Sequence, residues 1–207
     1  LAPVDRMHVV IEAMRLAYRD RADYLGDPDH VDMPIAHLLD KSYARELSAK
    51  IDLAHAIPSA SLPPIRTDDP NHHTTHFSVL DTAGNRVAAT LSVNYPFGAA
   101  SVPAGTGVLL NNEMDDFATS PLTPNAYGLV GGSANAVGPG RRPLSSMTPT
   151  FLEGPERIGI LGTPGGSRII SMVLIGVLEY ARGEDPDKWV SAPRYHHQYL
   201  PDHVEFE

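Results

Sequence analysis

The chain has 207 residues, of which 42% are hydrophobic and 20% charged, proportions that are ordinary for a globular protein. Its formal net charge of -9 argues against a nucleic-acid binder, because neutralising phosphates requires a basic face. The absence of cysteine excludes disulfides, a cysteine nucleophile and cysteine-ligated zinc, and no apolar run approaches the ~18 residues of a membrane span.

The first part of the chain is expected to be helical. Residues 7–25 carry apolar side chains at intervals of three or four, with charged residues on the other side, which predicts an amphipathic helix that ends at Gly26. A shorter helix is predicted over 42–51. Residues 57–73 contain Pro58, Pro63, Pro64 and Pro70 and few apolar pairs, so they are expected to form an exposed linker that a cleavage reaction can reach.

From residue 75 onward the apolar pattern changes to a period of two, which is typical of strands. A hairpin turn is expected at 82–85, and a second one at Gly154-Pro155. The predicted strands cover residues 75–81, 86–93, 107–111, 149–153 and 157–161, with a last strand beginning at 204–206.

Two helices are predicted near the end of the chain, over 167–182 and 185–192. The first has a broad apolar stripe and stops at Gly183, and the second has a proline at its first position after Asp185. Antiparallel hairpins followed by helices indicate a layered α+β fold.

Five sequence features follow one another along the chain: TTHFSV at 74–79, Asn94, NNEMDDF at 111–117, RPLSSM at 142–147 and PGGSR at 164–168. This ordered set resembles the γ-glutamyltransferase family, also called γ-glutamyltranspeptidase or glutathione hydrolase. The resemblance covers nearly the whole chain and is dense from 74 to 198. It implies the αββα sandwich of the N-terminal-nucleophile hydrolases, incomplete in this chain because family members extend further at both ends.

In this family a precursor cuts itself just before a threonine, and the matching bond here is His73–Thr74. The resemblance therefore makes residues 1–73 the end of the large-subunit region with its linker. Residues 74–207 then form most of the small, catalytic subunit, truncated at its C-terminus. Since the sequence shows that bond intact, the chain on its own is expected to be unprocessed and inactive.

The resemblance makes Thr74 the nucleophile. A hydroxyl is a weak nucleophile near pH 7 and needs a base. The α-amine of a newly N-terminal threonine, with an ordinary pKa of ~7.7–8.0, serves as that base. Without the later blocks, Thr74 and Thr75 would read as ordinary strand residues. Ser92, where the family usually has threonine, is expected to support the nucleophile.

Residues that bind the substrate follow from the same blocks. Asn94, Glu113 and Asp116 resemble the clamp for the α-ammonium of a γ-glutamyl group, which needs anionic acceptors. An alternative is that Asp115 and Asp116 only cap a turn. Ser145 and Ser146 resemble the pair that contacts the substrate carboxylate, and the family's main carboxylate-binding arginine lies outside this chain.

Gly165 and Gly166 are expected to form the oxyanion hole, because backbone N–H groups without side chains can approach a developing oxyanion closely. A phosphate loop is a poor alternative, since the lysine of such loops is missing. Tyr127 lies where some family members carry a lid, although a surface aromatic fits its loop equally well.

No metal or organic cofactor is expected. The histidines cluster at 72–76 and 196–203 without the spacing of known metal motifs. The expected substrates are γ-glutamyl compounds such as glutathione, with water, an amino acid or a peptide as acceptor. Two alternatives remain: a related amidase such as a cephalosporin acylase, against which Glu113 and Asp116 argue because glutaryl groups have no α-amine, and an inactive binding or assembly fragment.

The family resemblance suggests a periplasmic or extracellular location, and no targeting segment is expected within this chain. Open strand edges and apolar faces of an incomplete sandwich favour self-association. The preferred acceptor, the balance between hydrolysis and transfer, and the oligomeric state are left open by the sequence.

Overall fold

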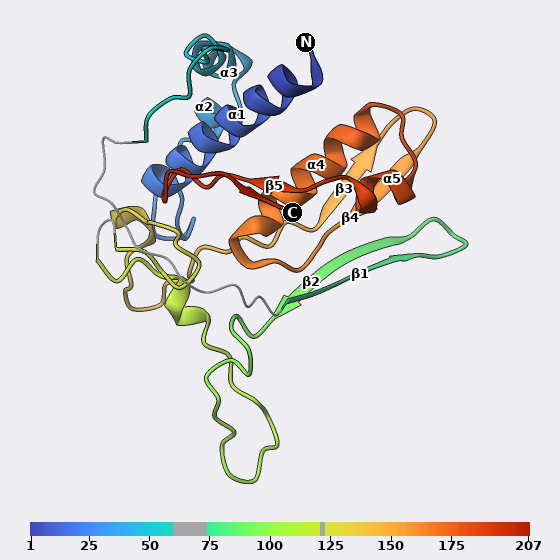
Figure 1. Cartoon of the computed structure of the whole chain (residues 1–207). Helices are drawn as coiled ribbons and strands as arrows, with labels where there is room; N and C mark the ends of the chain where they lie inside the picture. The colour runs from blue at the N-terminus through green and yellow to red at the C-terminus, as the bar shows by residue number, and fades with distance from the viewer. Residues whose placement is uncertain (60–73, 121–122) are drawn as a thin grey trace. The chain divides into compact units, whose positions relative to one another are not determined.

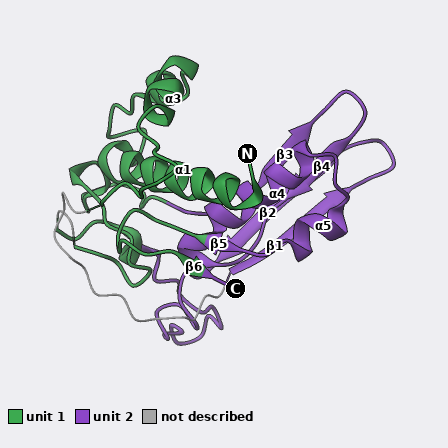
Figure 2. Ribbon diagram, turned by 45° about the horizontal axis from the view of Figure 1, so that its top comes forward, with its two compact units in different colours: residues 1–69, 114–144, 196–205 green, residues 70–113, 145–195, 206–207 purple. Residues whose placement is uncertain are grey.

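The computed structural model of the chain describes residues 1–59, 74–120 and 123–207. They divide into two compact units, drawn in green and purple in Figure 2. Unit 1 draws on the ranges 1–69, 114–144 and 196–205, and unit 2 on the ranges 70–113, 145–195 and 206–207. Most of the predicted linker, including His72 and His73, lies outside the described residues.

The predicted first helix of unit 1 is confirmed as α1, Pro3–Tyr24, which begins four residues earlier than expected. Its start is favoured by a proline at the first helical position, where no N–H partner is needed. Met14, Tyr18 and Ala22 recur every four residues and are buried. Gly26 follows the helix, and a side chain there would collide with the backbone carbonyl of Ala134.

The second predicted helix is α3, Lys41–Ser48, which ends three residues before the expected limit. Asp40 caps it, because its carboxylate accepts a hydrogen bond from the Ser42 backbone N–H at 2.6 Å. The single turn α2, Ile35–Leu38, precedes α3. A helix of four residues is too short to show an apolar period, so the sequence pattern did not predict it.

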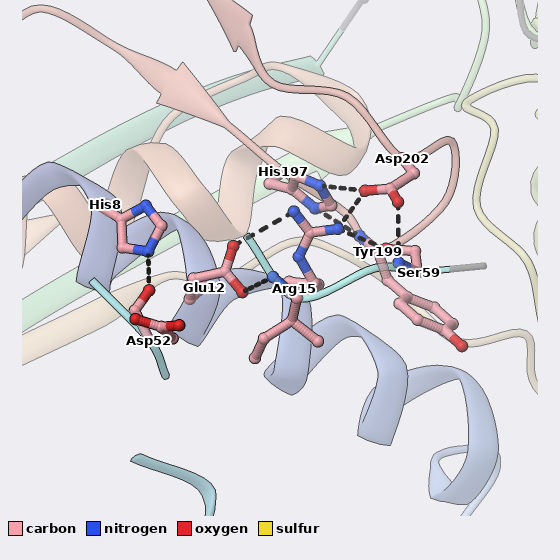
Figure 3. A network of polar contacts seen from close by, with 9 residues as sticks. His8, Glu12, Arg15, Asp52, Ser59, His197, Tyr199 and Asp202 are labelled. Carbon is pink, nitrogen blue, oxygen red and sulfur yellow. Dashed lines mark hydrogen bonds and ion pairs between the residues drawn. The ribbon is translucent and has the colours of Figure 1, made fainter. Parts of the chain in front are cut away.

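A buried polar network ties α1 to two distant segments of unit 1 (Figure 3). Arg15 donates to Ser59 Oγ at 2.6 Å, pairs with Asp202, and lies 3.3 Å from Glu12 Oε1. Asp202 accepts a second bond from the Ser59 N–H at 2.8 Å, and Glu12 accepts one from the Ile57 N–H at 3.1 Å. Glu12, Arg15 and Ser59 are each at most 5% exposed, so this network replaces hydration that burial removed.

His197 belongs to the same network and is fully buried. Its Nδ1 accepts from the Tyr199 N–H at 3.0 Å, so the proton lies on Nε2, which is 3.3 Å from Asp202 Oδ1. Burial, assisted by the charge of Arg15, lowers the pKa of His197 to about 4. Because the unfolded imidazole binds a proton at a higher pH than the folded one, the stability linked to His197 is lost as the pH falls from ~6.5 toward 4.

The ranges 114–120 and 123–144 of unit 1 fold as short turns rather than long regular elements. The one-turn 3-10 helix η1, Glu113–Asp116, leads into the first range, and η2, Ser133–Asn135, lies in the second. The Gly132 N–H donates to the Ala22 carbonyl at 2.8 Å, and Arg142 pairs with buried Asp27 at 2.6 Å. The hydrogen bonds from Arg142 hold the pKa of Asp27 well below its usual range. These contacts join the second range to the end of α1 and the turn after it.

Unit 2 contains the first predicted hairpin, which is confirmed (Figure 1). Strand β1, Thr74–Leu80, pairs antiparallel with β2, Arg86–Ser92, in a register that places Thr74 opposite Ser92. Asp81 closes the turn by accepting from the N–H groups of Ala83 and Asn85. The register follows from this turn, since a slip of one residue would reverse the faces.

The second hairpin and the two later helices are also confirmed in unit 2. Strand β3, Thr150–Glu153, pairs with β4, Ile158–Leu161; a short 3-10 helix, η3, Gly166–Arg168, leads into α4, Ile169–Ala181; and α5 covers Pro186–Ser191. Buried Ile169, Val173 and Ile175 supply the apolar side of α4. Asp185 caps α5 through the Lys188 N–H at 3.1 Å.

The predicted strand over 107–111 is wrong. Gly107 has a φ of 66°, and Val108 and Leu110 are 58% and 42% exposed. The Leu110 N–H donates to the Ser101 carbonyl, so this segment folds back on its own loop instead of joining a sheet. The expected last strand is present as β6, Glu205–Phe206, which pairs with β5, Tyr195–His196.

Helices and antiparallel strand pairs together confirm the α+β class. Within the ranges that the structure covers, no helix combines the length and the apolar character needed to cross a membrane.

Candidate active site

The structure brings the side chains of Thr74 and Ser92 together. The two residues face each other at the open end of the β1–β2 hairpin, and their hydroxyl oxygens lie 3.1 Å apart. Ser92 Oγ also accepts a hydrogen bond from the Asn94 N–H at 2.9 Å. The backbone that follows β2 therefore holds the hydroxyl beside Thr74, which fits the predicted supporting role of Ser92.

Asn94 is 4% exposed and adopts a left-handed backbone conformation, with a φ of 73°. Asparagine tolerates this region better than most residues because its short polar side chain can bond locally. Its Nδ2 donates to the Asn112 carbonyl at 3.2 Å, and Asn112 Oδ1 accepts from the Tyr95 N–H at 3.0 Å. These bonds join the end of β2 to the beginning of the 111–117 block within unit 2.

Gly165 and Gly166 have φ values of 143° and 57°, which favour glycine. A side chain at Gly165 would also overlap the end of Met172. The Arg168 N–H donates to the Gly165 carbonyl at 3.1 Å, which starts η3 and then α4. The pair therefore forms the tight turn from which a helix starts, a place where backbone N–H groups stabilise an anion.

From the sequence, His76 was noted only as a member of the histidine cluster at 72–76, and no role was predicted for it. It lies two residues after Thr74, on the same strand face. Its Nδ1 is 2.8 Å from Thr90 Oγ1, its Nε2 is 3.1 Å from Ser78 Oγ, and burial lowers its pKa. The period of two could have placed it beside the nucleophile, but its packing against Gly162 could not be read from the sequence.

Glu113 and Asp116 begin and end η1. Glu113 is half-buried, and burial raises the pKa of its carboxyl. Asp116 Oδ1 accepts from Asn125 Nδ2 at 3.2 Å, and its backbone carbonyl accepts from Asn135 Nδ2 at 2.7 Å. The carboxylate of Asp116 is therefore held by the side chain of Asn125 from a neighbouring loop. Whether Asp116 binds the ammonium or caps a turn stays a prediction.

A small cavity of about 10 Å³ in unit 1, large enough for one water, is lined by Asp116, Asn125 and Arg21 among others. Burial lowers the pKa of the Arg21 guanidinium, and the charge of Asp116 opposes this effect. Arg21 is a neighbour that sequence reasoning missed, because α1 lies more than ninety positions away in the sequence.

The remaining predicted residues lie in loops. Ser145 Oγ accepts from the Met147 N–H at 3.0 Å, and Ser146 is half-buried. Tyr127 is held through its backbone, since its N–H donates to Asn125 Oδ1 at 3.0 Å and its carbonyl accepts from Gln198 Nε2 at 2.8 Å. The roles of these residues, including the lid, stay predictions.

The predicted site residues are shared between the two units. Asp116 and Tyr127 belong to unit 1, whereas the others belong to unit 2: Thr74, Ser92, Asn94, Glu113, Ser145, Ser146, Gly165 and Gly166. Over residues 1–59, 74–120 and 123–207, no three histidine or acidic side chains gather as a metal site would require.

Comparison with known proteins bears on this arrangement. The family model described as gamma-glutamyltranspeptidase matches residues 1–207. The glutathione hydrolase proenzyme of Pseudomonas sp. (strain A14) is 48% identical over 203 residues, which are 97% of this chain and 35% of that protein. The glutathione hydrolase proenzyme of Escherichia coli (strain K12) is 46% identical over 208 residues, which are 98% and 36% of the two chains. The chain spans about a third of the length of these relatives.

Solved structures are similar as well. A threonine-to-alanine mutant of the γ-glutamyltranspeptidase of Helicobacter pylori matches with a TM-score of 0.61 and 47% identity, over 64% of this chain and 72% of that one. The structure of an acivicin-inhibited γ-glutamyltranspeptidase matches with the same score and identity, over 64% and 71% of the two chains.

Proposed function

Because the chain belongs to the γ-glutamyltranspeptidase family, we propose that the protein hydrolyses or transfers the γ-glutamyl group of compounds such as glutathione. Thr74 is the nucleophile of this proposal, after cleavage of the His73–Thr74 bond. The observation that carries it is the pairing of Thr74 Oγ1 with Ser92 Oγ at 3.1 Å, at the first residue of β1. Both relatives described above are named proenzymes, and the acivicin-inhibited γ-glutamyltranspeptidase is described as autoprocessing.

The first chemical step is acylation. Thr74 Oγ1 attacks the γ-carbonyl carbon of the substrate while the α-amine released by cleavage takes the hydroxyl proton. When the tetrahedral intermediate collapses, the amide C–N bond breaks and that proton passes to the departing amine. A γ-glutamyl ester of Thr74 remains. Water or an acceptor amine then attacks the ester carbonyl, loses a proton to the α-amine and restores the Thr74 hydroxyl.

Charge develops on the former carbonyl oxygen in both steps. The N–H groups of Gly165 and Gly166 are the proposed donors, and the positive φ values of both glycines support this role because they make a compact turn without side chains. Ser92 is proposed to keep Thr74 Oγ1 in one rotamer, since its own oxygen is held by the Asn94 N–H.

The substrate's amino-acid end is proposed to be held by oppositely charged and polar groups. Asn94, Glu113 and Asp116 receive the α-ammonium, and Ser145 and Ser146 contact the α-carboxylate. The Asn94–Asn112 bond of 3.2 Å supports this assignment, because it fixes Asn94 next to the block that contains the acidic residues.

The proposal is tested on the full-length protein by intact mass and by amine release from a γ-glutamyl anilide. We expect two chains, one of which begins at Thr74, and catalysed release of the anilide amine. A protein that remains uncut and inactive on γ-glutamyl amides, or that is cut at another bond, would overturn the proposal.

Replacing Asp116 by alanine in the full-length protein is expected to lower kcat/KM for γ-glutamyl anilide by about one to two orders of magnitude, through loss of a charge-assisted hydrogen bond of ~1.5–3 kcal/mol. A glutaryl anilide lacks the α-ammonium, so its hydrolysis should not fall. Asp115→Ala, which changes an exposed neighbour, is the matched control. Equal losses on both substrates would show that Asp116 does not bind the ammonium.

A further inference from the structure

His76 has a fixed position on the face of β1 that carries Thr74. Its two ring nitrogens are held by Thr90 Oγ1 at 2.8 Å and Ser78 Oγ at 3.1 Å. Thr90 is the register partner of His76, as Ser92 is of Thr74, so the two polar pairs are adjacent steps of one hairpin. A ring held at both nitrogens resists rotation, which makes it a rigid spacer.

The imidazole of His76 packs directly against the backbone of Gly162. A side chain built on Gly162 would lie 2.5 Å from Nε2 and closer still to Cε1 and Nδ1. Such a distance is far inside van der Waals contact, so any Cβ at this position would displace the ring. The absence of a side chain at Gly162 therefore leaves the room that the imidazole of His76 occupies.

Both partners of this contact stand a few residues from the proposed chemistry. His76 is two residues from Thr74, and Gly162 is three residues before Gly165. Strand geometry makes the first connection stiff, and Pro164 with its fixed φ restricts the second. A shift of the imidazole against Gly162 therefore changes the distance between the nucleophile and the turn at Gly165-Gly166.

We infer that His76 is a positioning residue that sets the spacing between Thr74 and the Gly165-Gly166 turn through its contact with Gly162. This inference rests on the proposed function of that site. His76 transfers no proton in this scheme. It acts by keeping the attacking oxygen and the oxyanion donors at a productive separation, and a displacement of about 1 Å in such geometry costs up to about a hundredfold in rate.

A double-mutant cycle in the full-length protein tests the contact. His76→Ala, Gly162→Ala and the double variant are compared with the unmodified protein on γ-glutamyl anilide, with rates expressed per cut chain. Gly162→Ala is expected to lower kcat about ten- to a hundredfold with KM nearly unchanged, because spacing and not substrate binding is disturbed. The double variant should be no slower than Gly162→Ala alone, since removal of the imidazole makes room for the new methyl group.

Two further variants separate positioning from general damage to the fold. His76→Asn keeps a polar atom near Thr90 and should recover part of the kcat lost in His76→Ala. Phe77→Ala removes a side chain that is 49% exposed on the opposite face of β1, and should leave kcat unchanged. If a variant fails to fold, the His76→Asn and His76→Ala pair still tests the inference through the ratio of their kcat values.

The outcomes distinguish this inference from the function on which it rests. No amine release from the unmodified protein would refute the function itself. If the unmodified protein is active and the losses of His76→Ala and Gly162→Ala simply multiply in the double variant, the two residues are uncoupled and the positioning role fails. A rise in KM with constant kcat would also overturn it, because His76 would then act on substrate binding.

Discussion

Replacing Thr74 by alanine is expected to leave the full-length protein as a single uncut chain, with γ-glutamyl anilide turnover lowered by at least about four orders of magnitude. Alanine has no hydroxyl, so neither the proposed cleavage of the His73–Thr74 bond nor formation of the ester can begin. Because the uncut bond also keeps the α-amine as an amide, nucleophile and base are lost together. Intact mass and amine release measure the two effects independently.

Thr75→Ala is the matched control, since Thr75 pairs with Leu91 and lies on the opposite, exposed face of β1. It should be cut and active. Thr74→Ser keeps a hydroxyl beside Ser92 and should retain cleavage, although more slowly. A Thr74→Ala protein that is cut normally and remains active would remove Thr74 from the mechanism.

Replacing Arg15 by alanine is expected to destabilise unit 1 by about 3–5 kcal/mol, the usual cost of breaking a buried ion pair from one side. Glu12 is 1% exposed and would lose its cationic neighbour, and Ser59 and Asp202 would lose their common donor. In native-state hydrogen exchange, the amides of α1 should exchange about two to four orders of magnitude faster.

Arg19→Ala provides the comparison on the same helix. Its side chain is 34% exposed and pairs with Asp20, so its removal should accelerate α1 exchange by less than about tenfold. Similar exchange rates in the Arg15 and Arg19 variants would show that the buried network contributes no more than the partly exposed Arg19–Asp20 pair.

The parts of the fold that depend on local pattern were predicted well. α1, both hairpins and α4 follow from apolar periods, turn residues and glycine stops, and the likeness to solved γ-glutamyltranspeptidases confirms the predicted N-terminal-nucleophile hydrolase fold. The strand predicted at 107–111 failed because an apolar run alone cannot show that Gly107 has a positive φ and that the Leu110 N–H bonds back to the Ser101 carbonyl of its own loop.

The candidate site was identified from the resemblance of its blocks to a family, and local physics alone would have treated Thr74 as an ordinary strand residue. Neither the family resemblance nor the local sequence pattern predicted contacts between distant segments. The packing of His76 on Gly162 joins positions 86 residues apart, and the bond from Arg15 to Ser59 joins positions 44 apart. Such pairs are set by the tertiary fold, which periodicity and motif spacing do not encode.

Unit 1 is built from segments that lie on both sides of the His73–Thr74 bond in the sequence. Ala22, Asp27 and Ser59 precede that bond, and the groups that hold them, on Gly132, Arg142 and Asp202, follow it. A nicked protein would thus keep one shared core, to which covalent continuity is not essential. The two polypeptides could separate only if that core unfolded. A heterodimer made by cleavage is therefore already assembled in the folded precursor. Its formation would then be independent of protein concentration, because the partners never have to meet by diffusion.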